Sequence, residues 1–130
     1  MEITQHEIKL AKFEEKARQL KTELDYINLI KEEVADYFRL VPDSLSKKSR
    51  LRTYVWPRQI AIYFTREFTT FGLLDIARMY GLTNHATALH SIRVVKNDIS
   101  VDKRKLNQIN QIKLNLLQHG IEERNEEGRS

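Results

Sequence analysis

The sequence predicts an all-α protein, and three observations support this class. The 130 residues include only two prolines and four glycines, so few positions interrupt a helix. No segment sustains the alternation of apolar and polar residues that is typical of strands. Apolar residues instead recur at spacings of three and four, the period of one helix face. We expect one compact helical domain containing a helix-turn-helix, preceded by a long N-terminal helix.

The glycines and the apolar pattern divide the chain into helices and three parts. Gly81 and Gly120 fall where apolar patterns stop, as glycines at helix ends do. Helices are expected at about residues 4–25, 26–38, 57–68, 73–79, 84–97 and 102–118. We therefore predict an N-terminal helix over residues 1–26, a compact domain over 27–118 and a polar tail over 119–130.

The first helix carries the heptad pattern of a coiled coil. Its apolar residues follow spacings of 3, 4, 3, 4 and 3: Leu10, Phe13, Ala17, Leu20, Leu24 and Ile27. Ile3 extends the pattern backward, and after Ile27 it shifts to Ile30 and Val34, which predicts a junction with the compact domain. Residues 3–27 therefore form either a homodimer interface or a helix lying along a groove of its own domain, and the sequence leaves both open.

Positive charge is concentrated in the middle of the chain. Residues 1–40 carry 7 basic and 9 acidic side chains, residues 41–96 carry 9 and 3, and residues 97–130 carry 6 and 6, which gives the net charge of +4. A localised basic region is typical of nucleic-acid-binding proteins, although alone it is a weak indicator.

A loop with an uneven charge distribution precedes the third expected helix. It holds four cations and no acid after Asp43: Lys47, Lys48, Arg50 and Arg52. Such a run is either a solvated loop or a contact for DNA phosphates. Pro57 suits the first turn of the next helix, where Arg58 and Gln59 beside unpaired N–H groups favour a phosphate. For Arg66, farther along that helix, a surface ion pair is the alternative.

Residues 72–93, GLLDIARMYGLTNHATALHSIR, predict a short helix, a tight turn and a longer helix. One face of the longer helix is apolar and is expected in the core: Ala88, Leu89, Ile92, Val95 and Ile99. The opposite face is small and polar enough for a DNA groove: Thr83, Ala86, Thr87, His90, Arg93 and Asn97. Asn84 suits adenine, and Ala86 suits a thymine methyl. Helical phase predicts His85 as a cap or a partly buried side chain that reaches outward only from the helix end.

Residues 57–93, PRQIAIYFTREFTTFGLLDIARMYGLTNHATALHSIR, resemble the C-terminal DNA-binding domain of the bacterial replication initiator DnaA. The PRQ element and the later pattern xHxTxLHxxR carry the likeness, which begins around Ile27 and fades near Leu117. The resemblance implies that a helix-turn-helix contacts AT-rich duplex DNA in the major groove. It also implies that a loop arginine, matched here to Arg50, enters the neighbouring minor groove.

The resemblance also implies which side chains contact bases and which contact phosphates. Base contacts would come from Arg50, Leu73, Leu74, Asn84, His85 and Ala86. Phosphate contacts would come from Arg58, Gln59, Arg66, Thr87, His90 and Arg93, joined by Lys47, Lys48 and Arg52 of the loop. The expected partner is double-stranded DNA, and the expected role is regulation of replication or transcription.

The sequence departs from the family pattern where bases are contacted. The second glycine of the turn is Leu82, the signature Arg-Asp is Thr83-Asn84, a hydroxyl residue is replaced by Ala86, and the proline of the first helix is Leu74. An Asp that accepts from cytosine N4 cannot become Asn without changing the preferred hydrogen bonds. We expect a site preference that differs from DnaA boxes. The alternative is a protein-interaction module that has lost specific DNA binding, and recognition of structured RNA is a weaker third reading.

Several classes of function are not expected from this sequence. The four glycines form no phosphate loop, so the domain is expected to stand alone without an ATPase domain or a nucleotide. The chain has no cysteine, and its four histidines are scattered, which argues against a metal site or an enzyme. No apolar run approaches the roughly 20 residues of a membrane span. We expect a cytoplasmic, nucleoid-associated protein without a cofactor or a membrane partner.

Overall fold

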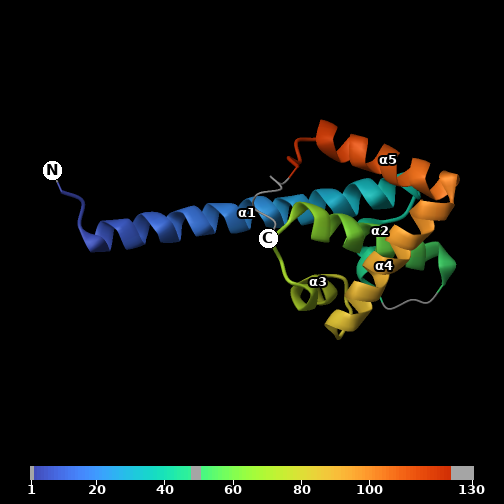
Figure 1. The fold of residues 1–130 in the computed structure, drawn as a ribbon, viewed down its shortest axis with the longest axis horizontal. Coiled ribbons are helices and arrows are strands. Elements are labelled where there is room, and N and C mark those ends of the chain that lie inside the picture. The colour runs from blue at the N-terminus through green and yellow to red at the C-terminus, as the bar shows by residue number, and fades with distance from the viewer. Residues whose placement is uncertain (1, 48–50, 124–130) are drawn as a thin grey trace.

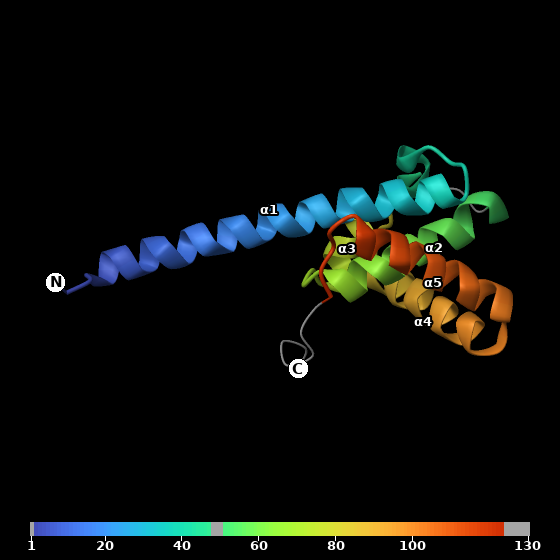
Figure 2. The ribbon, with the colours of Figure 1, turned by 90° about the horizontal axis from the view of Figure 1, so that it is seen from above.

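The structure is a computed structural model that describes residues 2–47 and 51–123, and it confirms the all-α class. Six helical elements follow one another: α1 (Gln5–Tyr37), the 3-10 helix η1 (Pro42–Ser46), α2 (Arg52–Phe68), α3 (Leu73–Met79), α4 (His85–Val101) and α5 (Lys103–Gln118). No strand occurs in the part of the chain that is described. Figure 1 and Figure 2 show a helical head from which one half of α1 extends.

The head is built around one core to which every element contributes. Helix α4 packs against α2 and α3, and α5 returns beside α1 (Figure 1). The 3-10 helix η1 packs against both α1 and α2. Fully buried side chains from these elements include Ile30, Leu45, Phe64, Val95 and Ile112. Each such side chain contributes about 1.5–3 kcal/mol by leaving water, so the core fixes the positions of the shorter helices.

Helix α1 is a single helix of 33 residues, so the predicted division into two helices near residue 25 is wrong. The shift of the apolar pattern after Ile27 marks a change of surroundings rather than a break. Residues 5–22, here called the arm, are all exposed, and the first buried side chains of α1 are Glu23 and Ile27. Both views show the arm projecting away from the head. The apolar seam therefore does not lie in a groove of its own domain.

Helix α2 begins at Arg52, five residues before the predicted start at Pro57. A proline inside a helix removes one hydrogen bond and crowds the preceding turn, and here it falls in the second turn of a 17-residue helix. Pro57 itself is buried, so packing offsets the lost bond. The N–H groups of Arg58 and Gln59 consequently lie inside the helix, so the helix N-terminus predicted beside these two residues is wrong, while their contact with DNA phosphates stays a prediction.

The segment after α5 is partly packed and is not wholly the polar tail predicted from residue 119. Gly120 has a φ of 100° and turns the chain at the end of α5. Ile121 then enters the core with 2% of its surface exposed. The backbone N–H of Glu122 donates to Tyr26 Oη over 3.3 Å, so this end of the chain is attached to α1.

Candidate nucleic-acid interface

The turn between α3 and α4 depends on Gly81. Its φ of 73° is the left-handed conformation that closes the end of α3. Gly81 N donates to Arg78 O, and Leu82 N donates to Ala77 O over 2.8 Å. A Cβ on Gly81 would lie 2.1 Å from the carbonyl oxygen of Ser46. Backbone from η1 therefore sits directly against this turn, and only glycine fits there.

Lys31 of α1 binds the same region through hydrogen bonds. Its Nζ donates to Met79 O at 2.9 Å and to Ser46 Oγ at 3.2 Å, and Ser46 Oγ donates to Met79 O at 3.2 Å. The ammonium also lies 4.9 Å from the centre of the Tyr80 ring. Burial lowers the pKa of Lys31, and the nearby Asp43 carboxylate opposes this shift. Lys31 thus joins α1, η1 and the end of α3, a role that its sequence position did not reveal.

The first turn of α4 is capped by Asn84. Its Oδ1 accepts from Thr87 N at 3.0 Å and from Thr87 Oγ1 at 3.1 Å, and such a cap contributes about 1 kcal/mol. An Asn that pairs with adenine uses its oxygen as an acceptor and its nitrogen as a donor at the same time. Because the cap occupies the oxygen, Asn84 can offer DNA only its Nδ2 donor while α4 keeps this geometry.

The predicted division of α4 into two faces agrees with the burial of its residues. Ala88, Ile92 and Val95 are buried, whereas Leu89 and Ile99 are half-buried. The predicted polar face is exposed throughout: Thr83, Ala86, Thr87, His90, Arg93 and Asn97. His85 is exposed at the first position of the helix, so it is not the partly buried side chain that helical phase suggested.

Helix α3 presents one of its two candidate leucines to solvent. Leu74 is exposed, whereas Leu73 is half-buried and packs against the core. At the other end of α3, Tyr80 is fully buried and its hydroxyl lies 2.7 Å from Thr65 Oγ1 of α2. The short helix is therefore held at both ends, and Leu74 is the better placed of the two for a ligand.

Two α2 residues that were predicted to contact DNA phosphates donate hydrogen bonds to backbone carbonyls of this protein. Arg58 donates from Nη1 to Lys47 O at 2.8 Å, and burial lowers the pKa of this half-buried guanidinium. Arg66 donates from Nη1 to Phe71 O at 3.2 Å, which supports the chain between α2 and α3. Neither contact is the surface ion pair considered for Arg66. Both side chains hold loops that lead to the helix-turn-helix.

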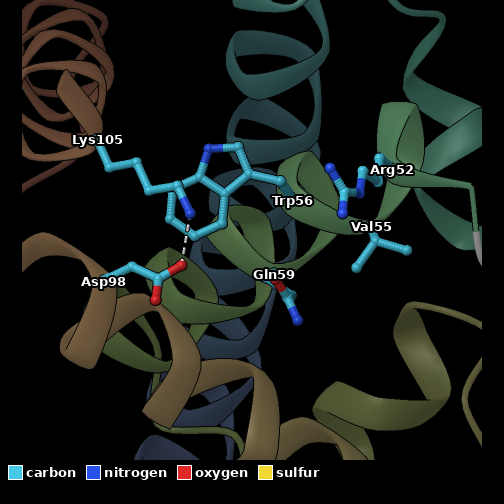
Figure 3. A pocket seen from close by; sticks show the side chains of 6 residues that line it. All are labelled: Arg52, Val55, Trp56, Gln59, Asp98 and Lys105. Atoms are coloured by element: carbon cyan, nitrogen blue, oxygen red, sulfur yellow. Dashed lines mark hydrogen bonds and ion pairs between the residues drawn. The ribbon is translucent and has the colours of Figure 1, made fainter. Parts of the chain in front are cut away.

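Arg52 and Gln59 both line an open pocket between α2, α4 and α5 (Figure 3). Beside them, the Lys105 ammonium lies 4.5 Å from the centre of the Trp56 ring and 2.7 Å from Asp98 Oδ2. Gln59 therefore belongs to this corner, whereas the side chain of Arg58 turns to Lys47.

The loop cations are only partly described. Lys47 is exposed at the end of η1, whereas Lys48 and Arg50 lie outside the described residues. The three ion pairs found in residues 2–47 and 51–123 all involve α4 beyond residue 97, α5, Glu33 or the segment after α5. Lys47, Arg52 and Arg93 have no carboxylate partner there. Exposed Arg78 on α3 shares this property and was missed because its pattern resembles any helix surface.

Other kinds of site are not visible in the described residues. Within residues 2–47 and 51–123, no group of three or more His, Asp or Glu side chains could hold a metal ion. None of the helices in that part of the chain combines the length and the apolar composition needed to cross a membrane.

Comparison with known proteins shows which family has this arrangement of helices. The family model described as bacterial dnaA protein helix-turn-helix matches residues 27–95. The chromosomal replication initiator protein DnaA of Wolbachia sp. subsp. Brugia malayi (strain TRS) is 37% identical over 84 residues, which are 65% of this chain and 18% of that protein. The protein of the same name from Wolbachia pipientis wMel is 38% identical over 87 residues, 67% of this chain and 19% of that protein. The one from Geotalea daltonii (strain DSM 22248 / JCM 15807 / FRC-32) is 33% identical over 91 residues, 70% of this chain and 20% of that protein.

These matches cover most of the head and little of the relatives. The chain spans about a fifth of the length of the curated relatives it matches. The matched residues include the turn at Gly81, the contact of Ser46 with that turn and the exposed face of α4. The chain therefore belongs to the bacterial DnaA helix-turn-helix family.

Proposed function

We propose that this protein binds duplex DNA, with the first half of α4 in the major groove. The contact between Ser46 and Gly81 carries this proposal, because it joins the helix-turn-helix to the start of the basic loop. Lys47, the next residue, is exposed beside the turn. A reading helix and a cationic segment on one rigid unit can contact bases and backbone together, which is how phosphate contacts position a protein for base readout.

The exposed residues divide by the part of DNA that each suits. His85, Ala86 and the Nδ2 group of Asn84 lie at the start of α4, where side chains of a recognition helix contact bases, and Leu74 adds an apolar surface from α3. Thr87, His90 and Arg93 follow on the same exposed face and suit phosphates. Because Asn84 offers a donor where an Asp would accept, the preferred site differs from that of relatives with Asp.

The basic loop is assigned to the backbone and the neighbouring minor groove. Lys47 and Arg52 flank the segment that contains Lys48 and Arg50, and both flanking side chains are exposed. A cationic loop suits the negative potential of a narrow, AT-rich minor groove. Arg50 is assigned to this groove on the family resemblance, as the sequence suggested. In this proposal the main role of Arg58, Gln59 and Arg66 is to hold the DNA-binding surface in place through contacts within the protein, rather than to contact DNA.

The biological role proposed here is regulation of replication or transcription at the nucleoid. The curated relatives carry the name chromosomal replication initiator protein, and a protein with a related reading helix could occupy sites near those that initiators bind. No catalytic step is part of this proposal.

Selection of bound duplexes from a random DNA pool tests the proposal directly. We expect a winning motif that binds about 10³-fold more tightly than a scrambled duplex, the lower end of the usual specific range. Affinity for both duplexes at two salt concentrations separates base readout from backbone attraction. Steep salt dependence without enrichment would reduce the protein to a non-specific DNA coat, and absence of binding would contradict the proposal.

Three substitutions, one of them a control on the arm, connect that result to the surface. Arg93→Ala should weaken binding to every duplex. It should also reduce the slope of log affinity against log salt concentration by about 1, because one phosphate contact is lost. Lys12→Ala removes an equally exposed cation from the arm and should change neither quantity. His85→Ala should reduce the preference for the winning motif, and equal losses on all sequences would argue against base readout.

A protein-interaction module that has lost specific DNA binding remains the second candidate, favoured by the replaced residues of the turn and of α4. Asn84→Asp together with Ala86→Thr tests it, since Asp also caps helices and the scaffold is left intact. If the wild-type protein selects no motif and this double variant does, the wild-type head has kept the fold of a sequence-specific DNA-binding domain but has lost that function.

A further inference from the structure

The arm carries an exposed apolar stripe that nothing in the described structure covers. The stripe runs along one face at heptad spacing: His6, Leu10, Phe13, Ala17, Leu20 and Leu24. Its four largest apolar side chains, Leu10, Phe13, Leu20 and Leu24, are 44–70% exposed. The next position, Ile27, is 4% exposed because its own head covers it. The stripe therefore ends where the head begins.

We propose that this stripe binds the same stripe of a second copy of the chain, with the two arms antiparallel. In the antiparallel arrangement that pairs position 6 with position 24, every stripe residue meets a partner. Leu10 then faces Leu20 of the second copy, and Phe13 faces Ala17. A large side chain opposite a small one fills each central layer, as close packing requires.

A parallel pair in register fits the same stripe less well. It would place Ala17 opposite Ala17 and Phe13 opposite Phe13, leaving one layer underfilled and the next crowded. It would also bring the two copies together at Ile27, where each head already covers the stripe. In the antiparallel pair the two heads lie at opposite ends of the paired arms, and the contact of Thr70 with Glu23 is level with the start of the other arm, because α1 begins at Gln5.

The charges that flank the stripe favour the same orientation. In coiled coils these flanking positions set partner choice and direction. The antiparallel pair brings Glu7 beside Lys21 and Lys9 beside Glu23, each twice, against one Glu14–Glu14 and one Lys16–Lys16 contact. The parallel pair brings Lys9 beside Glu14 and Lys16 beside Lys21, each twice. Glu23 also accepts from Thr70 N and Thr70 Oγ1, so the Glu7–Lys21 pairs are the freer of the two favourable sets.

This geometry separates the two heads. Residue 27 lies 12 residues beyond the centre of the paired arms, so the two copies of Ile27 are about 36 Å apart at a rise of about 1.5 Å per residue. The heads lie at opposite ends of the paired arms, each starting at the contact of Thr70 with Glu23. If the proposed DNA binding holds, one dimer can hold two separate duplex sites, and this consequence alone depends on the proposed function.

Sedimentation of the full chain without DNA, over a micromolar to millimolar concentration series, tests the dimer independently of DNA binding. We expect reversible association to a dimer. Leu20→Lys should weaken dimer formation by at least about tenfold, because it places a charge where the dimer would bury a leucine. Gln19→Lys, which places the same charge on the adjacent outward face, should leave it unchanged. A monomer at every concentration, or a larger assembly, would overturn the proposal.

Charge reversal and cross-linking test the orientation. Lys21→Glu should weaken the antiparallel dimer roughly fivefold, the scale of exposed charge pairs, and Glu7→Lys in the same chain should restore it. In a parallel pair the first change would strengthen association by removing the Lys16–Lys21 repulsion. The chain has no cysteine, so an oxidised mixture of His6→Cys and Leu24→Cys chains should cross-link only between the two variants. Cross-links within a Leu24→Cys sample alone would overturn the antiparallel arrangement.

Discussion

The arm and the turn of the helix-turn-helix are stabilised in opposite ways. Gly81, Ser46 and Lys31 hold the turn by long-range contacts from three elements. Among the described residues the arm makes none of these long-range contacts. Its start is capped locally by Thr4, whose Oγ1 accepts from Glu7 N. Most helical stability in proteins comes from packing an amphipathic face, and the second copy that we propose would supply that packing to the arm.

This difference predicts where the molecule tolerates change. Substitutions in the head should act on the free energy of unfolding of a single chain, whatever its concentration. Substitutions on the stripe should act on association, which depends on concentration. Each experiment below therefore pairs a change in the head with a matched change elsewhere.

The largest effect is expected from Gly81→Ala. An L-residue in the left-handed conformation costs roughly 1–2 kcal/mol, and the new Cβ would also overlap the Ser46 carbonyl oxygen. We expect a loss of about 4 kcal/mol or more, in the range reserved for severe mechanisms, measured by urea unfolding. Gly120→Ala is the control, because its φ is also positive but nothing lies within 4 Å of the added Cβ. Equal losses would show that the Ser46 contact contributes little.

Truncating core and stripe residues comes next. Ile30 is fully buried and Leu10 is 50% exposed on the same helix. Ile30→Ala should lower the unfolding free energy by about 2–5 kcal/mol, whereas Leu10→Ala should leave it nearly unchanged in dilute solution. A large loss from Leu10→Ala in a sedimentation-verified monomer would show that the arm packs on its own head.

The same contrast explains how much of the fold the sequence could predict. The predicted range of α3 agrees with the structure, and the predicted starts of α4 and α5 lie within one residue of those observed, because helix ends are set by local signals such as the glycine at position 81. The errors came from long-range packing. Burial of Pro57 lets α2 start five residues early, and the head changes which face of α1 is covered without breaking the helix.

The site could be predicted only in outline, for the same physical reason. The exposed face of α4 follows from helical periodicity, so Thr87, His90 and Arg93 were predictable from spacing. That Arg58 donates to Lys47 O and Lys31 to Met79 O was not, because residues far apart in sequence meet only once the core has formed. The sequence therefore predicted which face of α4 is exposed, but not the long-range hydrogen bonds of Arg58 and Lys31.

A smaller effect with a distinctive pH dependence is expected at Tyr80. Burial raises the pKa of its hydroxyl well above 10.0. As the pH rises above 10.0, the unfolded chain loses this proton and the folded chain keeps it, so stability is lost with rising pH. Tyr80→Phe should flatten this decline and cost about 1–2 kcal/mol at neutral pH, because Thr65 loses a hydrogen-bond partner. Exposed Tyr37→Phe is the control, measured by urea unfolding at several pH values.

The smallest effects should distinguish the helix caps of the two regions. Asn84→Ala removes the cap of α4 and should lower the unfolding free energy by about 1 kcal/mol, while Asn84→Asp should restore most of it. Thr4→Ala removes the cap of the arm, but fraying there is not coupled to the core, so we expect no measurable change in unfolding of the head. Helicity by circular dichroism should still fall slightly for Thr4→Ala. A comparable loss of unfolding free energy from both alanine variants would mean that the arm and the head unfold as one cooperative unit, and the contrast between them would fail.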